Sequence, residues 1–132
     1  VRRGDYLAPE FAHLNVCDQD YYMEAMQKMK AQKPDAVFYI FTNNHKEVEW
    51  IKENYDFSGF EVRYVDLDNP DYEELRLMYH CKNFIISNST YSWWGQFLSD
   101  NPHKIVMAPS VWNREMNADG IYMPDWQVIK VK

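Results

Sequence analysis

The 132-residue chain contains only two cysteines, Cys17 and Cys81, and no long run of apolar residues. Cysteines this sparse do not indicate a disulfide scaffold in a chain that can form a core, so we expect two reduced thiols. The longest apolar stretches, at 36–41 and 84–86, have the length of strands. They fall far short of the roughly 20 residues that a membrane-spanning helix needs. The sequence therefore predicts neither a disulfide-stapled domain nor a transmembrane segment.

The chain also lacks positive net charge and the usual metal or phosphate motifs. Its formal net charge is −6 at pH 7, so no general field favours nucleic acid, and an anion would need a local site. The histidines show no metal-ligand spacing, and no Walker-type loop or Gly-x-Ser-x-Gly motif is present. An Asp-x-Asp sequence at 66–68 is similar to the metal-binding pair of some sugar transferases. So short a match is common, and we interpret it as a solvated turn.

Apolar and aromatic residues, by contrast, are plentiful. Hydrophobic side chains make up 46% of the chain and aromatic ones 17%, which is enough for one domain with a core. Strand-like segments alternate with helix-like segments. We expect strands at 1–3, 36–42, 60–65, 84–87, 104–108 and 127–130, and helices at 20–31, after Asn44, at 72–80 and at 91–98. This order predicts an α/β fold, a Rossmann-like parallel sheet with helices on both faces.

Polar segments follow three of the expected strands, at 2–6, 42–45 and 87–92. Ligands of parallel α/β sheets bind at the carboxyl ends of the strands, so these segments are expected to converge in space. The segment at 42–45 has two interpretations that stay open. Its side chains either contact a sugar or ribose, or they cap the helix that follows.

The segment at 87–92 runs directly from an apolar strand into an apolar helix. Backbone N–H groups and hydroxyls at a helix start can hold a phosphate, but capping by Ser89 or Thr90 uses the same groups, so the two interpretations compete. The residues 88–90 also match a glycosylation sequon, which we discount because a strand-to-helix junction is a poor acceptor. The tryptophans at 93–94 are expected in the core or in a groove wall, where they would hold this helix rigidly.

Two arginines, Arg2 and Arg3, stand at the other end of the chain. A guanidinium matches the geometry of phosphate oxygens and keeps its charge at any relevant pH, and Asp5 could hold one of the two in place. We expect these arginines to bind the same anion as the segment at 87–92. The alternative is a solvated charge pair in a loop.

Three motifs follow one another in an informative order. They are Val-Arg-Arg-Gly-Asp-Tyr at 1–6, Phe-Tyr-Ile-Phe-Thr-Asn-Asn at 38–44, and a long motif at 77–95 that ends in Asn-Ser-Thr-Tyr-Ser-Trp-Trp-Gly. Together they resemble the bacterial α-1,2-fucosyltransferase family (glycosyltransferase family 11) through nearly the whole chain up to Trp112. The last motif is highly specific to that family, and the first is specific in combination with it.

This resemblance implies that residues 1–132 are a single donor-binding domain, the C-terminal half of a GT-B-type glycosyltransferase. The N-terminal acceptor domain, its expected partner, would be absent from this chain, which would then be inactive on its own. The implied reaction is the inverting, metal-independent transfer of fucose from GDP-fucose to the 2-hydroxyl of a galactose-containing glycan, without a cofactor. The implied setting is bacterial glycan biosynthesis in the cytoplasm, with at most a peripheral association with the inner membrane.

Residue by residue, the resemblance also implies a donor site. Arg2 matches the arginine that binds the donor diphosphate, and Glu74 matches an acidic position that holds the guanine N–H groups. The full implied donor-binding set is Arg2, Arg3, Thr42, Asn43, Glu74, Asn88, Ser89, Thr90 and Ser92. The catalytic candidates are Arg2, which would stabilise the departing phosphate, and Asp5 and Glu10 as candidate general bases.

The sequence departs from the family pattern in two places. The family motif begins with a histidine that would directly precede Val1, and the residues Thr-Asn-Asn at 42–44 stand where the family usually carries acidic residues, often Ser-Asp-Asp. Asparagine keeps the hydrogen bonding and loses the charge, so we expect donor binding to persist. The alternatives are another nucleotide-sugar transferase half-domain and a non-catalytic module that binds a nucleotide or glycan.

Overall fold

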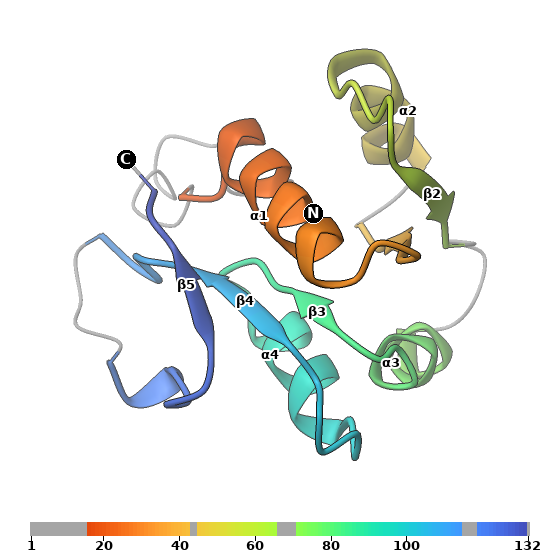
Figure 1. Cartoon of the computed structure of the whole chain (residues 1–132). Helices are drawn as coiled ribbons and strands as arrows, with labels where there is room; N and C mark the ends of the chain where they lie inside the picture. Colours follow the sequence, from red (N-terminus) through yellow and green to blue (C-terminus); the bar gives the residue numbers. More distant parts are fainter. Residues whose placement is uncertain (1–15, 43–44, 66–70, 115–118, 132) are drawn as a thin grey trace.

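The computed structural model describes residues 16–42, 45–65, 71–114 and 119–131. Strands and helices alternate along these residues, as the sequence predicts (Figure 1). The helices are α1 (Gln19–Gln32), α2 (His45–Asn54), α3 (Asp71–Tyr79) and α4 (Thr90–Leu98), with a short 3-10 helix, η3 (Asp119–Ile121). The strands are β1 (Val37–Ile40), β2 (Glu61–Tyr64), β3 (Phe84–Ile85), β4 (Val106–Pro109) and β5 (Gln127–Ile129). The strand expected at 1–3 lies outside the described residues.

The described strands pair in parallel and are divided between two sheets. One sheet contains β1 and β2, with Phe38 opposite Val62. The other has β4 between β3 and β5, with Ile85 and Gln127 on either side of Met107. The parallel α/β arrangement is confirmed, while the single continuous sheet that we expected is divided into two within the described residues.

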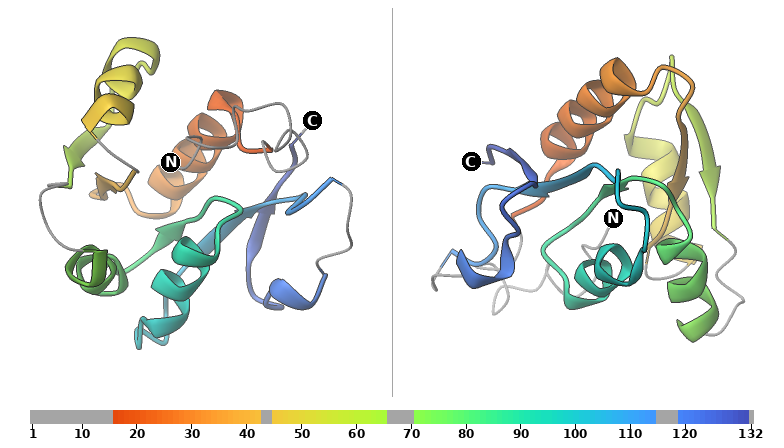
Figure 2. Two further views of the ribbon diagram at one scale, coloured as in Figure 1. Left: turned by 180° about the vertical axis from the view of Figure 1, so that it is seen from behind. Right: turned by 60° about the horizontal axis from the view of Figure 1, so that its bottom comes forward.

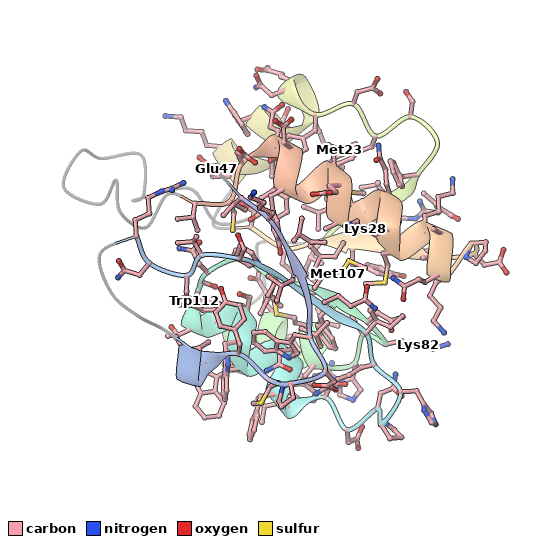
Figure 3. All side chains as sticks on the ribbon, turned by 60° about the vertical axis from the view of Figure 1, so that its left-hand side comes forward. Met23, Lys28, Glu47, Lys82, Met107 and Trp112 are labelled. Atoms are coloured by element: carbon pink, nitrogen blue, oxygen red, sulfur yellow. The ribbon has the colours of Figure 1, made fainter. Side chains whose placement is uncertain are left out.

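Helices cover both faces of the β3–β4–β5 sheet (Figure 2). Successive side chains of β4 pack on opposite faces of this sheet. Met107 packs in one buried cluster with Tyr21 and Ala25 of α1. Its neighbours Val106 and Ala108 pack in a second cluster, which includes Met78 of α3 and Trp112. In Figure 3, Met107 lies in the sheet that α1 covers, and Trp112 lies beside α4. The prediction of helices on both faces is thus confirmed for this sheet.

The start of α1 is fixed by a side-chain cap and by a tyrosine. The Asp18 carboxylate accepts a hydrogen bond from the Tyr21 backbone N–H at 2.9 Å, which satisfies one of the N–H groups that a helix start leaves unpaired. The Tyr21 hydroxyl donates to the Ile86 carbonyl oxygen, 2.6 Å away, just beyond β3. This bond ties α1 to the strand end from which the candidate site begins.

The helices α3 and α4 pack closely because Gly95 has no side chain. A Cβ atom at Gly95 would lie 2.2 Å from the Met78 Sδ atom and 2.8 Å from its Cγ atom. Met78 is buried at this contact. Within the described residues, no helix combines the length and the apolar character needed to span a membrane.

Candidate functional site

The chain leaves β3 through buried residues and enters α4 at a capped helix start. Ser87, Asn88 and Ser89 are all buried, and Thr90, the first residue of α4, is exposed. Ser89 has an extended backbone, with φ −131° and ψ 143°, and its hydroxyl accepts a hydrogen bond from the Ser92 N–H at 3.1 Å. The predicted cap is confirmed, with Ser89 as the capping residue.

The serine hydroxyls at this helix start bond to one another and to the backbone. The Ser92 hydroxyl donates to the Ser87 carbonyl oxygen at 3.0 Å and lies 2.8 Å from the Ser89 hydroxyl oxygen. Ser87 Oγ lies 3.3 Å from Ser89 Oγ. The hydroxyls of Ser89 and Ser92 thus serve the cap. The exposed groups at the start of α4 that can reach an external anion include the Thr90 side chain, next to the N–H groups of the first turn.

Asn88 joins three segments that are far apart in sequence. Its side-chain Nδ2 donates to the Trp112 carbonyl oxygen at 2.9 Å, and its Oδ1 accepts a hydrogen bond from Cys17 Sγ at 3.6 Å. The residue is only 2% exposed, so it is inaccessible as a glycosylation acceptor, as the sequence indicates. Burial raises the pKa of the Cys17 thiol to about 11, which keeps the thiol protonated at neutral pH.

Thr42 and Glu74, two further residues of the predicted donor-binding set, are both buried. Thr42 follows β1 and is 3% exposed, and its hydroxyl has no hydrogen-bond partner in the part of the chain that the structure describes. Glu74 lies on α3 and is 9% exposed. A buried hydroxyl without a partner is costly, by about 1–3 kcal/mol, so the Thr42 side chain is suited to a ligand that supplies the missing bond.

Several predicted site residues lie outside the described residues, namely Arg2, Arg3, Asp5, Glu10 and Asn43. The Asp-x-Asp sequence at 66–68 also lies outside them. The convergence of the two arginines with the start of α4 therefore stays a prediction. Among the residues that the structure does describe, no group of three or more His, Cys, Asp or Glu side chains is placed to hold a metal ion.

A pocket beside the first turns of α4 was not predicted from the sequence. It has a volume of about 160 Å³ and is lined by Thr90, Trp93, Trp94, Trp112, Gly120 and Ile121. The Trp93 ring is fixed in its wall, because its Nε1–H donates to the Ile121 carbonyl oxygen at 3.0 Å. This confirms the expectation of a groove wall for the tryptophan pair, with Trp94 48% exposed.

Comparison of the sequence with known families and proteins identifies the family of the chain. The sequence profile described as glycosyl transferase family 11 matches residues 1–130. The chain belongs to glycosyl transferase family 11. It is 32% identical over 132 residues to the O-antigen biosynthesis glycosyltransferase WbnK of Escherichia coli. The matched region covers 96% of the chain and 42% of that protein.

Two further relatives carry more specific names. An alpha-1,2-colitosyltransferase of Escherichia coli is 32% identical over 126 residues, covering 89% of the family 11 chain and 42% of that enzyme. The human galactoside alpha-(1,2)-fucosyltransferase 1 is 25% identical over 134 residues, covering 96% of the chain and 36% of that protein. The chain thus spans 36% to 42% of the length of these relatives. No solved structure matches it.

Proposed function

We propose that this chain is the donor-binding part of an α-1,2-fucosyltransferase. The intact enzyme would transfer fucose from GDP-fucose to the 2-hydroxyl of a galactose-containing glycan, with inversion and without a metal ion. The family match carries this proposal, together with relatives named as an alpha-1,2-colitosyltransferase and a galactoside alpha-(1,2)-fucosyltransferase. The chemistry of the donor then assigns a role to each part of the candidate site.

The start of α4 is the seat that we propose for the donor diphosphate. Negative charge develops on the leaving GDP as the bond between fucose and phosphate breaks. The positive end of the α4 dipole and the exposed Thr90 hydroxyl would meet that charge, and the guanidinium of Arg2 would close on it from the other side. These groups would replace the divalent ion that other sugar transferases use. Ser89 and Ser92 support the site by fixing the helix start.

Other residues of the predicted set would hold the remainder of the nucleotide. The buried Thr42 hydroxyl, together with Asn43, would bind the donor at the end of β1, and Glu74 would accept the guanine N–H groups. An inverting displacement needs a base for the incoming hydroxyl, and Asp5 and Glu10 are the candidates in this chain. The acceptor contacts and a stronger base would lie in the part of the enzyme that this chain does not span.

The relatives also support a second donor. The colitosyltransferase is 32% identical to the chain, against 25% for the human fucosyltransferase. Nucleotide-activated colitose is therefore the alternative to GDP-fucose. Calorimetric titration of the intact protein with GDP-fucose, GDP-colitose and UDP-galactose, with and without EDTA, separates these donors. We expect the GDP-linked sugars to bind with EDTA present. Exclusive binding of UDP-galactose would indicate a different transferase, and binding without transfer or donor hydrolysis would indicate a non-catalytic module.

The variant Arg2→Ala tests the proposed role of the guanidinium. Removing one charged donor from a developing anion typically lowers the rate by about 10²–10³, so we expect transfer to fall by at least that factor while the protein stays folded. The matched control is Arg63→Ala, which removes an exposed arginine from β2 that pairs with Glu61. Turnover near the wild-type rate in Arg2→Ala would remove Arg2 from the mechanism.

A further inference from the structure

The pocket between α4 and η3 opens beside the helix start that we propose for the diphosphate. Thr90, the first residue of α4, belongs both to that helix start and to the pocket lining. In a nucleotide sugar the sugar is bonded directly to the terminal phosphate. A sugar whose phosphate lies at the start of α4 would therefore lie next to this pocket.

The walls of the pocket are mainly apolar and are held in place. Indole rings and an aliphatic side chain form most of the lining, and the Nε1–H of Trp93 is already bonded to the Ile121 carbonyl oxygen. Trp93 also stacks on Phe97, with 5.0 Å between the ring centroids. Asn88 holds another lining residue in place, because its side chain donates to the Trp112 carbonyl oxygen at 2.9 Å. The pocket is thus pre-formed, as small-molecule sites usually are.

An apolar pocket of this kind favours a methyl group over a hydroxyl. A buried hydroxyl without a hydrogen-bond partner is penalised, and among the described residues that line the pocket only Thr90 has a hydroxyl-bearing side chain. Fucose and colitose, the sugars in the names of two relatives, are both 6-deoxy sugars with a methyl group at C6. A guanine base fits less well, because its polar edge needs several hydrogen-bond partners.

We propose that this pocket receives the C6 methyl group of a 6-deoxy sugar donor and thereby selects against donors that carry a C6 hydroxyl. The proposal rests on the proposed function. It adds that the C6 group is the part of the donor by which the pocket distinguishes one sugar from another. One group in an apolar pocket typically changes affinity or specificity by about 10–200-fold. We therefore expect a preference of this size for the deoxy sugar.

Two donors that differ at a single atom test the proposal. GDP-L-galactose is GDP-L-fucose with one added hydroxyl, on C6. Calorimetry on the intact wild-type protein should give a dissociation constant about 10–200-fold larger for GDP-L-galactose. The variant Ile121→Thr keeps the backbone carbonyl that binds Trp93 and adds a hydroxyl to the wall, so the ratio should fall below about threefold while GDP binds as before. The control is Val128→Thr on the exposed face of β5, which should keep the wild-type ratio.

A second variant keeps the test decisive if Ile121→Thr does not fold. Gly120 lines the pocket, and a Cβ atom there would meet no atom of the described residues within 4 Å, so Gly120→Leu adds bulk at the pocket without a clash at its Cβ atom. It should weaken GDP-fucose binding by at least about tenfold and leave GDP binding unchanged. Equal wild-type affinities for the two sugars, an unchanged ratio in a folded Ile121→Thr variant, or a matching loss of GDP affinity in Gly120→Leu would overturn the proposal. Failure of the wild type to bind GDP at all would instead overturn the proposed function.

Discussion

Asn88 shows at the scale of a single residue how the candidate site is built. The sequence places it between a strand and a helix, where it looks like a ligand or a glycan acceptor. The structure shows it 2% exposed and bonded to the Trp112 carbonyl oxygen. A residue predicted to bind the donor thus also joins the start of α4 to the segment that completes the pocket wall. The local sequence cannot predict this contact, because Trp112 lies 24 positions away.

Replacing Asn88 by alanine should destabilise the fold. The buried Trp112 carbonyl oxygen would lose its partner, and we expect the free energy of unfolding to fall by about 1–3 kcal/mol, measured by urea denaturation. The control is Asn54→Ala, whose Nδ2 also donates to a backbone carbonyl, that of Trp50 at 2.8 Å, but on the exposed surface. The control should change stability by less than about 0.5 kcal/mol. Equal effects in the two variants would contradict the role given to Asn88.

The Cys17 thiol should titrate late. Its pKa is raised to about 11 by burial, so in a Cys81→Ser background its alkylation rate should still rise between pH 9 and 11. Because the folded thiol holds its proton more tightly than the unfolded one, the free energy of unfolding should fall as the pH rises through this window. The check is alkylation followed by mass spectrometry across the pH range. A plateau near pH 9 would show an ordinary thiol.

At the scale of elements, the sequence predicts the helices and strands better than their contacts. Apolar runs such as 84–86 and the capping serine of α4 are local signals, and the structure confirms both. The division of the strands between two sheets is not local, and neither is the pocket, whose residues come from α4 and from the segment after β4. The roles of Trp112 and Gly120 in that last segment are apparent only from the pocket that they line together with residues of α4.

The contact between α3 and α4 depends on Gly95. Gly95→Ala would push its Cβ atom into the Met78 side chain, and overpacking of this kind costs about 1–3 kcal/mol. The better helix propensity of alanine offsets about 1 kcal/mol of this, so we expect a net loss of stability in thermal unfolding. Gly120→Ala, with open space around its Cβ position, is the matched control and should be close to neutral.

A double variant separates this clash from other effects of the substitution. Met78→Ala removes the side chain that the new Cβ atom would meet, so Gly95→Ala should cost less in the Met78→Ala background than in the wild type. Additive losses of stability in the two variants would show that the two residues do not clash.

At the scale of the whole molecule, an acidic chain is proposed to bind an anionic donor. With a net charge of −6, it must do so through a local positive field, which we assign to the start of α4 and to the arginines at 2–3. The profile match over residues 1–130 shows the family of the chain, and the chemistry that we propose for this site is based on it. The structure contributes the buried cap, the exposed Thr90 and the adjoining pocket.

The most direct test of the account is the affinity for GDP of the intact protein carrying Thr90→Asp. An acidic residue in the first turn suits the helix dipole, so the fold should keep its stability. The same carboxylate would repel a diphosphate at this helix start, and we expect the calorimetric affinity for GDP to fall at least about tenfold, with a smaller loss in Thr90→Asn, which replaces the hydroxyl by an uncharged amide. If Thr90→Asp binds GDP as tightly as the wild type, the diphosphate does not lie at the start of α4, and the central claim is wrong.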